Sequence, residues 1–256
     1  MVNSIRAVVW DMGGTLEELY YDQAIQQEAT HGLRHLLAEW GLDPGLGLDG
    51  LKSAVLSGVK AYQAWREERE IELPPERVWQ EHVFPDQGLP PERLAAAAED
   101  LTFFYETHYQ LRRLRPEAPS VLKVLHRKGF RLAIISNTIS RRLVQEKLAD
   151  YGIASYFDPV VTSSNFGWRK PDERIFHEAT RLMKLPPAVC AYVGDTVSRD
   201  VIGARRAGYG LAIQIKSFLT AQVDAGIDDV QPDAVVHDLT EVVELVAPIG
   251  EAVYGH

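Results

Sequence analysis

The second half of the chain alternates short apolar runs with helical stretches, and this rhythm constrains the fold more than any other feature. Four runs are apolar on both faces and a fifth is weaker: Arg131–Ile135, Pro159–Thr162, Val189–Val193, Leu211–Ile215 and Ala234–Val236. Such runs predict strands that are buried on both faces. Strands that alternate with helices predict an α/β fold, a doubly wound parallel sheet with helices on both faces.

Serines and glycines mark the expected ends of the helices between these runs, because serine favours the start of a helix and glycine its end. The three pairs are Ser120 with Gly129, Ser140 with Gly152, and Ser198 with Gly208. Near the N-terminus, Ile5–Trp10 supplies one more strand for the sheet.

The segment 17–115 interrupts the alternation with helical stretches and no convincing strand. Apolar residues recur there at helical spacing over Asp22–Trp40, Leu51–Glu70, Glu76–His82 and Glu92–Leu114. We therefore expect residues 1–16 and 116–247 to form the α/β core and residues 17–115 a smaller all-helical domain. Residues 248–256 are expected to form a loosely ordered tail.

Composition excludes several classes of function for a chain of 256 residues. Its net charge of −9 argues against a broad nucleic-acid surface. No apolar run approaches the roughly 20 residues that span a membrane, and the first residues turn polar too soon for a signal peptide. Cys190 is the single cysteine, so an intrachain disulfide or a cysteine zinc cluster is impossible. We expect a cytoplasmic protein with a buried Cys190; its oligomeric state stays open.

Two segments at strand ends offer groups that suit phosphate chemistry. Asp11 follows the first strand and precedes Gly13 and Gly14, a turn that can bring backbone N–H groups close to phosphate oxygens. Ser136 ends a later strand, where its hydroxyl could donate to a phosphoryl oxygen. Asp11 alone could equally well be an ordinary capping residue, and Ser136 alone is better interpreted as a helix-capping serine.

Two further segments supply charge at other strand ends. Lys170 stands directly before a proline that begins a helix, where it can neutralise a phosphate. Asp195 and Asp200 bracket a strand-to-helix turn, and hard carboxylate oxygens suit Mg²⁺. In an open parallel sheet, ligands bind at the carboxyl ends of the strands.

These four segments, in this order and with the helical insert between the first two, resemble the motifs of the haloacid dehalogenase-like hydrolases. The segments KPDERIF and VGDTVSRDVIGARRAG look very like the third and fourth motifs of that family. The resemblance covers 1–16 and about 116–247 and implies a Rossmann-like core. The insert is similar to the family's helical cap only in its position and helix content.

The resemblance implies a hydrolase that acts on a small phosphorylated substrate with Mg²⁺. Asp11 would attack phosphorus and form an aspartyl-phosphate, Ser136 would hydrogen-bond the phosphoryl group, and Lys170 would neutralise charge. The remaining implied residues contact substrate or hold metal. Gly14, Thr15 and Asn137 would bind substrate, while Asp11, the Gly13 carbonyl and Asp195 would bind Mg²⁺, with Asp200 orienting the site.

The sequence departs from the family's pattern at Gly13, where phosphatases of the family usually carry a second aspartate as acid and base. General acid–base help contributes about 10²–10⁴ in rate. The substrate's leaving group could need little protonation, another group such as Glu17, Glu18 or His31 could substitute, or turnover could be poor.

Three other functions stay open. Phosphonate cleavage in this family resembles a mechanism in which a cap lysine forms a Schiff base. Lys52 and Lys60 are the two lysines of the insert, and neither has a distinctive setting. A dehalogenase works without metal, which the acidic Asp195 and Asp200 argue against. A weakly active or non-catalytic binding protein would keep the site as a relict. We favour a phosphatase.

Overall fold

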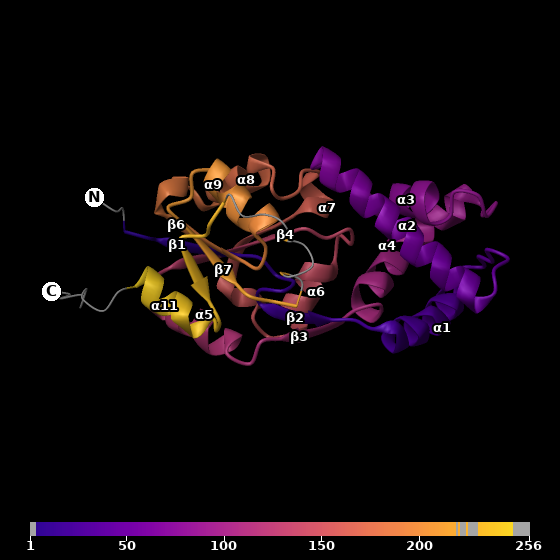
Figure 1. The fold of residues 1–256 in the computed structure, drawn as a ribbon, viewed down its shortest axis with the longest axis horizontal. Coiled ribbons are helices and arrows are strands. Elements are labelled where there is room, and N and C mark those ends of the chain that lie inside the picture. Colours follow the sequence, from indigo (N-terminus) through magenta and orange to yellow (C-terminus); the bar gives the residue numbers. More distant parts are fainter. Residues whose placement is uncertain (1–3, 219, 221–223, 225–229, 248–256) are drawn as a thin grey trace.

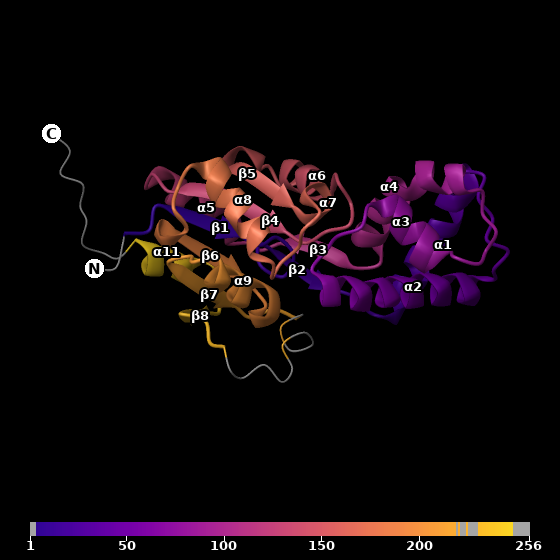
Figure 2. The same ribbon diagram turned by 90° about the horizontal axis from the view of Figure 1, so that it is seen from above.

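The computed structural model describes residues 4–218, 220, 224 and 230–247. Its core is a sheet of six parallel strands in the order β5-β4-β1-β6-β7-β8, all of which are labelled in the second of the two views (Figures 1 and 2). The strands are β1 (Ala7–Trp10), β4 (Arg131–Ser136), β5 (Phe157–Thr162), β6 (Cys190–Gly194), β7 (Leu211–Ile215) and β8 (Ala234–Val236). Each lies on a run that was predicted to be a strand, and the predicted doubly wound α/β fold is confirmed.

Helices cover both faces of this sheet (Figures 1 and 2). The helices packed on one face are α5 (Ala118–Arg127), α6 (Leu143–Asp150) and α11 (Thr240–Val246). On the other face lie α8 (Glu173–Met183) and α9 (Ile202–Arg206). Strand β1 contributes alternate residues to the two apolar clusters, and Cys190 is buried beside β1 as expected. Short α7 (Ser163–Phe166) follows β5.

The predicted helix ends are confirmed more fully than the predicted starts. Gly129, Gly152 and Gly208 all have positive φ, the conformation that lets glycine end a helix. Helix α5, however, begins at Ala118, so Ser120 lies inside its first turn and does not cap it. Pro119, the second residue of α5, fits this earlier start. Proline has no backbone N–H, and N–H groups in the first turn of a helix have no partner within the helix.

The insert packs around an apolar core of its own, apart from the six-stranded sheet (Figure 2). Its helices are α1 (Gln23–Glu39), α2 (Leu48–Arg69), α3 (Pro75–Val78), the π-helical turn η1 (Trp79–Val83) and α4 (Pro91–His108). Leu33, Tyr62, Trp79 and Leu101 are among the buried residues that these helices share. We call this group of helices the cap.

The prediction that the insert contains no strand is wrong. Strands β2 (Glu17–Tyr20) and β3 (Leu111–Leu114) form an antiparallel ribbon that joins the core to the cap, and α4 ends at His108. Local periodicity could not reveal the ribbon, because its inward-facing positions include the carboxylate of Glu17 and its partner strand lies at the far end of the insert.

Among the described residues, none of the helices is both long and apolar enough to pass through a bilayer. The expected cytoplasmic location stays a prediction. The expected tail, residues 248–256, lies outside the described residues.

Candidate active site

The carboxyl ends of three adjacent strands bring the candidate residues to one edge of the sheet. Strand β1 lies between β4 and β6, so Asp11, Ser136 and Asp195 follow or end neighbouring strands. The backbone N–H of Asp11 donates to the carbonyl of Val193 at 2.9 Å, which ties the β1 exit to β6. All three side chains are buried, with 6%, 5% and 1% exposure.

Lys170 links the acidic groups at this edge. Its ammonium donates to Asp11 Oδ1 at 2.7 Å, to Asp200 Oδ1 at 2.6 Å and to the Tyr192 hydroxyl at 2.9 Å. Burial alone would lower the pKa of Lys170, but the two carboxylates outweigh it and raise the pKa above its usual value. Lys170 is therefore a fixed cation against Asp11.

Asn137 positions the backbone of this lysine. Its amide oxygen accepts from the Lys170 N–H at 2.9 Å, and its amide nitrogen donates to the Lys170 carbonyl at 3.0 Å. The side chain that was expected to bind substrate is thus engaged with Lys170, although Asn137 still lines the cavity described below. Thr15, also expected to bind substrate, donates to Asp11 Oδ2 at 3.3 Å.

Three carboxylates meet beside the lysine. One oxygen from each of Asp11, Asp195 and Asp200 lies within 4.8 Å of the others. Burial, with the neighbouring charges of Asp200 and Asp11, raises the pKa of Asp195 to about 7. Burial also raises the pKa of Asp11, against the opposing effect of Lys170. This crowding of negative charge is the condition that a bound divalent cation relieves.

The carboxylate of Asp200 accepts more hydrogen bonds than those of Asp11 and Asp195. Oδ2 accepts from the Thr196 hydroxyl at 2.6 Å and from the Thr196 N–H at 3.0 Å, while Oδ1 accepts from Lys170 and Tyr192. Burial opposes ionisation, yet Lys170 and Arg199 together hold the pKa of Asp200 below its usual value. Asp200 is therefore arranged to orient Lys170.

Gly13 and Gly14 differ in whether the structure has room for a side chain at their positions. Gly14 has a φ of +89°, and a Cβ there would lie 2.3 Å from Asp195 Oδ2. Gly13 lies outside the left-handed region, and its Cβ would meet Leu19 Cδ1 at 3.1 Å and Arg112 Nη1 at 3.5 Å. The close approach of Asp195 requires Gly14, whereas Gly13 leaves a small space beside Arg112.

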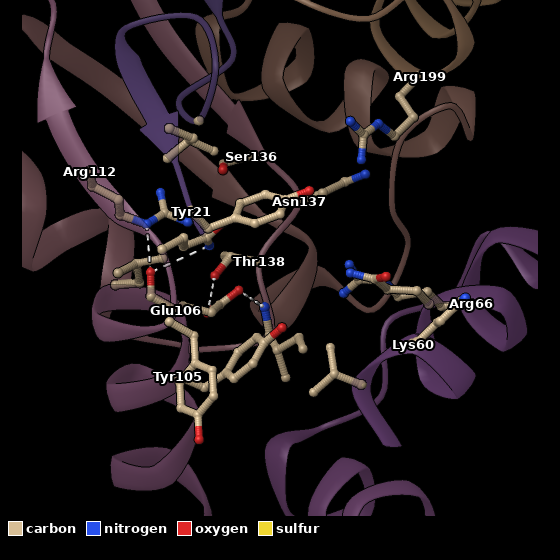
Figure 3. A pocket seen from close by; sticks show the side chains of 18 of the residues that line it. Tyr21, Lys60, Arg66, Tyr105, Glu106, Arg112, Ser136, Asn137, Thr138 and Arg199 are labelled. Atoms are coloured by element: carbon tan, nitrogen blue, oxygen red, sulfur yellow. Dashed lines mark hydrogen bonds between the residues drawn. The ribbon is translucent and has the colours of Figure 1, made fainter. Parts of the chain in front are cut away.

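A cavity of about 840 Å³ opens over these residues, between the sheet edge and the cap. The core contributes Asp11, Ser136 and Lys170, while α2 and the ribbon contribute cations. Figure 3 shows Lys60, Arg66 and Arg199 on one side of the cavity and Arg112 on the other. Glu106, which also lines the cavity, accepts from Thr138 Oγ1 at 2.8 Å (Figure 3). It also accepts from the Ser140 N–H at 2.9 Å.

The sequence did not indicate Tyr192, Glu106 or Arg112. Glu106 and Arg112 lie in the insert, which carries no motif, and Tyr192 stands in β6 one residue before the segment VGDTVSRD, where it resembles an ordinary buried strand residue. The substitutes considered for the missing acid are not free in the cavity. Glu17 is fully buried and accepts from Arg112 Nη1 at 2.7 Å and from the Tyr151 hydroxyl at 2.8 Å. Glu18 and His31 are exposed and do not line the cavity.

Comparison with known proteins identifies a family and several relatives. The family model for haloacid dehalogenase-like hydrolases matches residues 5–208. The chain is 28% identical to a glyceraldehyde 3-phosphate phosphatase of Methanopyrus kandleri, over 96% of this chain and 99% of the relative. It is 36% identical to a phosphoserine phosphatase of Thermus thermophilus, over 65% of this chain and 63% of the relative.

Solved structures share the fold along nearly the whole chain. A 2-haloacid dehalogenase from Pseudomonas syringae superposes with a TM-score of 0.66 at 25% identity, covering 95% of this chain and 98% of that one. A phosphatase from Thermococcus onnurineus superposes with a TM-score of 0.64 at 20% identity, with the same two coverages of 95% and 98%.

Proposed function

Because this chain belongs to the haloacid dehalogenase-like hydrolase family, we propose that it is a phosphatase that acts on a small phosphorylated metabolite through Asp11. One observation carries the proposal: Lys170, which lines the cavity with Asp11, donates to one oxygen of the Asp11 carboxylate, and a carboxylate oxygen of Asp195 lies within 4.8 Å of an Asp11 oxygen. Relatives along the chain are named as phosphatases, which supports this chemistry over the family's other reactions.

The residues present fit a Mg²⁺ ion. Asp11 and Asp195 offer carboxylate oxygens within 4.8 Å, and burial raises the pKa of both groups, so a cation bound between them would favour their ionised forms. Asp11, Asp195 and the carbonyl of Gly13 would hold the ion, while Asp200, occupied by Lys170 and Thr196, would orient the site. When bound, Mg²⁺ would neutralise phosphate oxygens and favour attack by a carboxylate.

The chain's own groups account for the first half of the reaction. Asp11 attacks phosphorus, the bond from phosphorus to the leaving oxygen breaks, and an aspartyl-phosphate forms. Lys170 stays beside Asp11 Oδ1 and neutralises the charge that gathers on the phosphoryl oxygens, while the Ser136 hydroxyl donates to one of them. Water then hydrolyses the aspartyl-phosphate and restores Asp11.

The cavity indicates a substrate with a second anionic group, such as a carboxylate or another phosphate. Lys60 and Arg66 of α2 and Arg199 of the core line one side of it (Figure 3). Arg66 is engaged on one side by Glu72, at 3.1 Å, while Lys60 is exposed and has no ion pair among the described residues. A phosphate at Asp11 leaves these cations available for a second charge.

Dehalogenation is the second candidate, since the solved dehalogenase shares the fold. Both reactions would use Asp11 as nucleophile, so the loss of activity in Asp11→Asn cannot separate them. The acidic pair Asp195 and Asp200 favours a metal-dependent reaction over a metal-free one. A phosphonate-cleaving enzyme or a relict binding protein would follow only if phosphate esters were not hydrolysed.

The test is hydrolysis of p-nitrophenyl phosphate and of a panel of phosphorylated metabolites, with and without Mg²⁺, beside halide release from 2-haloacids. We expect phosphate release that requires Mg²⁺ and falls by about 10³-fold or more in Asp11→Asn, because an amide is a poor nucleophile and a weaker ligand. Undiminished hydrolysis in Asp11→Asn or in excess chelator, or halide release in place of phosphate release, would contradict the proposal.

A further inference from the structure

Negative charge develops on the leaving oxygen in the proposed phosphatase reaction, and none of the roles assigned above stabilises it. Position 13 carries no side chain that could supply a proton, and Glu17, Glu18 and His31 do not line the cavity. Building on the proposed function, we propose that Arg112 stabilises the leaving oxygen by its charge, in place of an acid that would protonate it.

The position of Arg112 is the first argument. Its Nη1 lies 3.5 Å from the point where a Cβ of residue 13 would stand, two residues after the nucleophile. The guanidinium therefore borders the space that a side chain at position 13 would fill. Arg112 lines the same cavity as Asp11, together with Tyr21 and Ser136 (Figure 3).

The rigidity of Arg112 is the second argument. Nε donates to the Glu106 carbonyl at 2.7 Å, and Nη1 donates to Glu17 Oε2 at 2.7 Å. Glu17 is held in turn by the Tyr151 hydroxyl at 2.8 Å. A cation that is fixed before the reaction needs no reorganisation when charge appears, which is the condition for efficient electrostatic stabilisation.

The orientation of this ion pair is the third argument. The side chain of Glu17 is 0% exposed and does not line the cavity, whereas that of Arg112 is 10% exposed and does. The pair therefore presents its cation to the substrate and keeps its carboxylate behind. Among the described residues, Arg112 Nη2 has no hydrogen-bond partner and can donate to a ligand in the cavity.

The chemical step balances without an acid on the protein. Asp11 forms a bond to phosphorus, the bond to the leaving oxygen breaks, and that oxygen departs with the electron pair. Arg112 neutralises the negative charge as it forms, and the oxygen then takes its proton from water. A cation assists poor leaving groups most, because these carry the most charge in the transition state.

The experiment compares kcat/KM for aryl and alkyl phosphates of graded leaving-group pKa in the wild-type enzyme and in Arg112→Gln. We expect roughly 10²-fold loss on ethyl phosphate and less than about threefold loss on p-nitrophenyl phosphate, so the dependence on leaving-group pKa steepens. Arg113→Gln is the matched control, since Arg113 neighbours Arg112 on β3, is exposed and does not line the cavity. It should match the wild type.

Arg112→Lys keeps the charge but cannot reproduce both hydrogen bonds. The dependence of its kcat/KM on leaving-group pKa should therefore be steeper than in the wild type and shallower than in Arg112→Gln. If Arg112→Gln does not fold, the steepening of this dependence in Arg112→Lys relative to the wild type tests the proposal. Equal losses on both kinds of substrate, or no loss, in a folded variant would overturn the role of Arg112 and leave the proposed function intact. Hydrolysis that survives in Asp11→Asn would overturn both.

Discussion

Asp195 approaches the backbone of Gly14 so closely that residue 14 has no room for a side chain. A Cβ at Gly14 would lie 2.3 Å from Asp195 Oδ2, and the φ of +89° favours glycine independently. Position 13 differs, because Gly13 lies outside the left-handed region and a Cβ there would meet Leu19 Cδ1, the end of a flexible side chain, at 3.1 Å. The loss of the acid is therefore a chemical departure that the backbone does not require.

Alanine substitutions at the two glycines test this difference. Gly14→Ala should lose roughly 1–2 kcal/mol from the left-handed backbone alone and should also displace Asp195 and weaken Mg²⁺ binding. Gly13→Ala, the matched control, should change the free energy of unfolding by less than about 1 kcal/mol, because Leu19 Cδ1 can move. Urea denaturation and Mg²⁺ titration measure both effects. Equal behaviour of the two variants would contradict the geometry.

At the scale of elements, the sheet was predictable and the ribbon was not. Strands buried on both faces appear as apolar runs, so β1, β4 and β6, and with them Asp11, Ser136 and Asp195, follow from local pattern. The pairing of β2 with β3 joins opposite ends of the insert, and a buried carboxylate at Glu17 breaks the apolar alternation. Arg112 was missed because its place in the cavity depends on that pairing.

Helix α2 places Lys60 and Arg66 on the cavity side, where the proposed function would have them bind a second anionic group of the substrate. Lys60→Gln should raise KM for phosphoglycolate, which carries a carboxylate beside its phosphate, roughly two- to fivefold, because an exposed charge interaction contributes about that much to binding. KM for ethyl phosphate, which has no second anionic group, should not change. Lys52→Gln is the control on the same helix, since Lys52 donates to Gln27 at 3.2 Å and does not line the cavity. Steady-state kinetics that show the same change for both substrates would refute a second anion site.

At the scale of the whole molecule, folding brings three carboxylates together and leaves their charge partly uncompensated. Burial and the neighbouring charges of Asp200 and Asp11 raise the pKa of Asp195 from its usual value of 3.8 to about 7. A raised pKa means that the protonated form contributes stability below the unfolded value, and that this contribution is lost as pH rises through about 7. A cation that binds the ionised carboxylate should offset the loss.

Thermal denaturation tests this coupling between metal, charge and stability. Saturating Mg²⁺ should raise Tm more at about pH 8 than at about pH 6, because at the lower pH Mg²⁺ must displace a proton from Asp195. In Asp195→Asn the rise should be small and nearly independent of pH. A rise in Tm that is identical at both pH values in the wild-type protein would show that Asp195 does not hold the metal.

The proposed reaction depends on an aspartyl-phosphate at Asp11, and trapping this intermediate is its most direct test. Enzyme mixed with Mg²⁺ and p-nitrophenyl phosphate is quenched in acid during turnover, and its peptides are mapped by mass spectrometry. We predict a phosphoryl group on the peptide that contains Asp11, and its absence from Asp11→Asn and from enzyme in excess chelator. Turnover with the phosphoryl group on another residue, or persistent turnover in Asp11→Asn, would contradict the account.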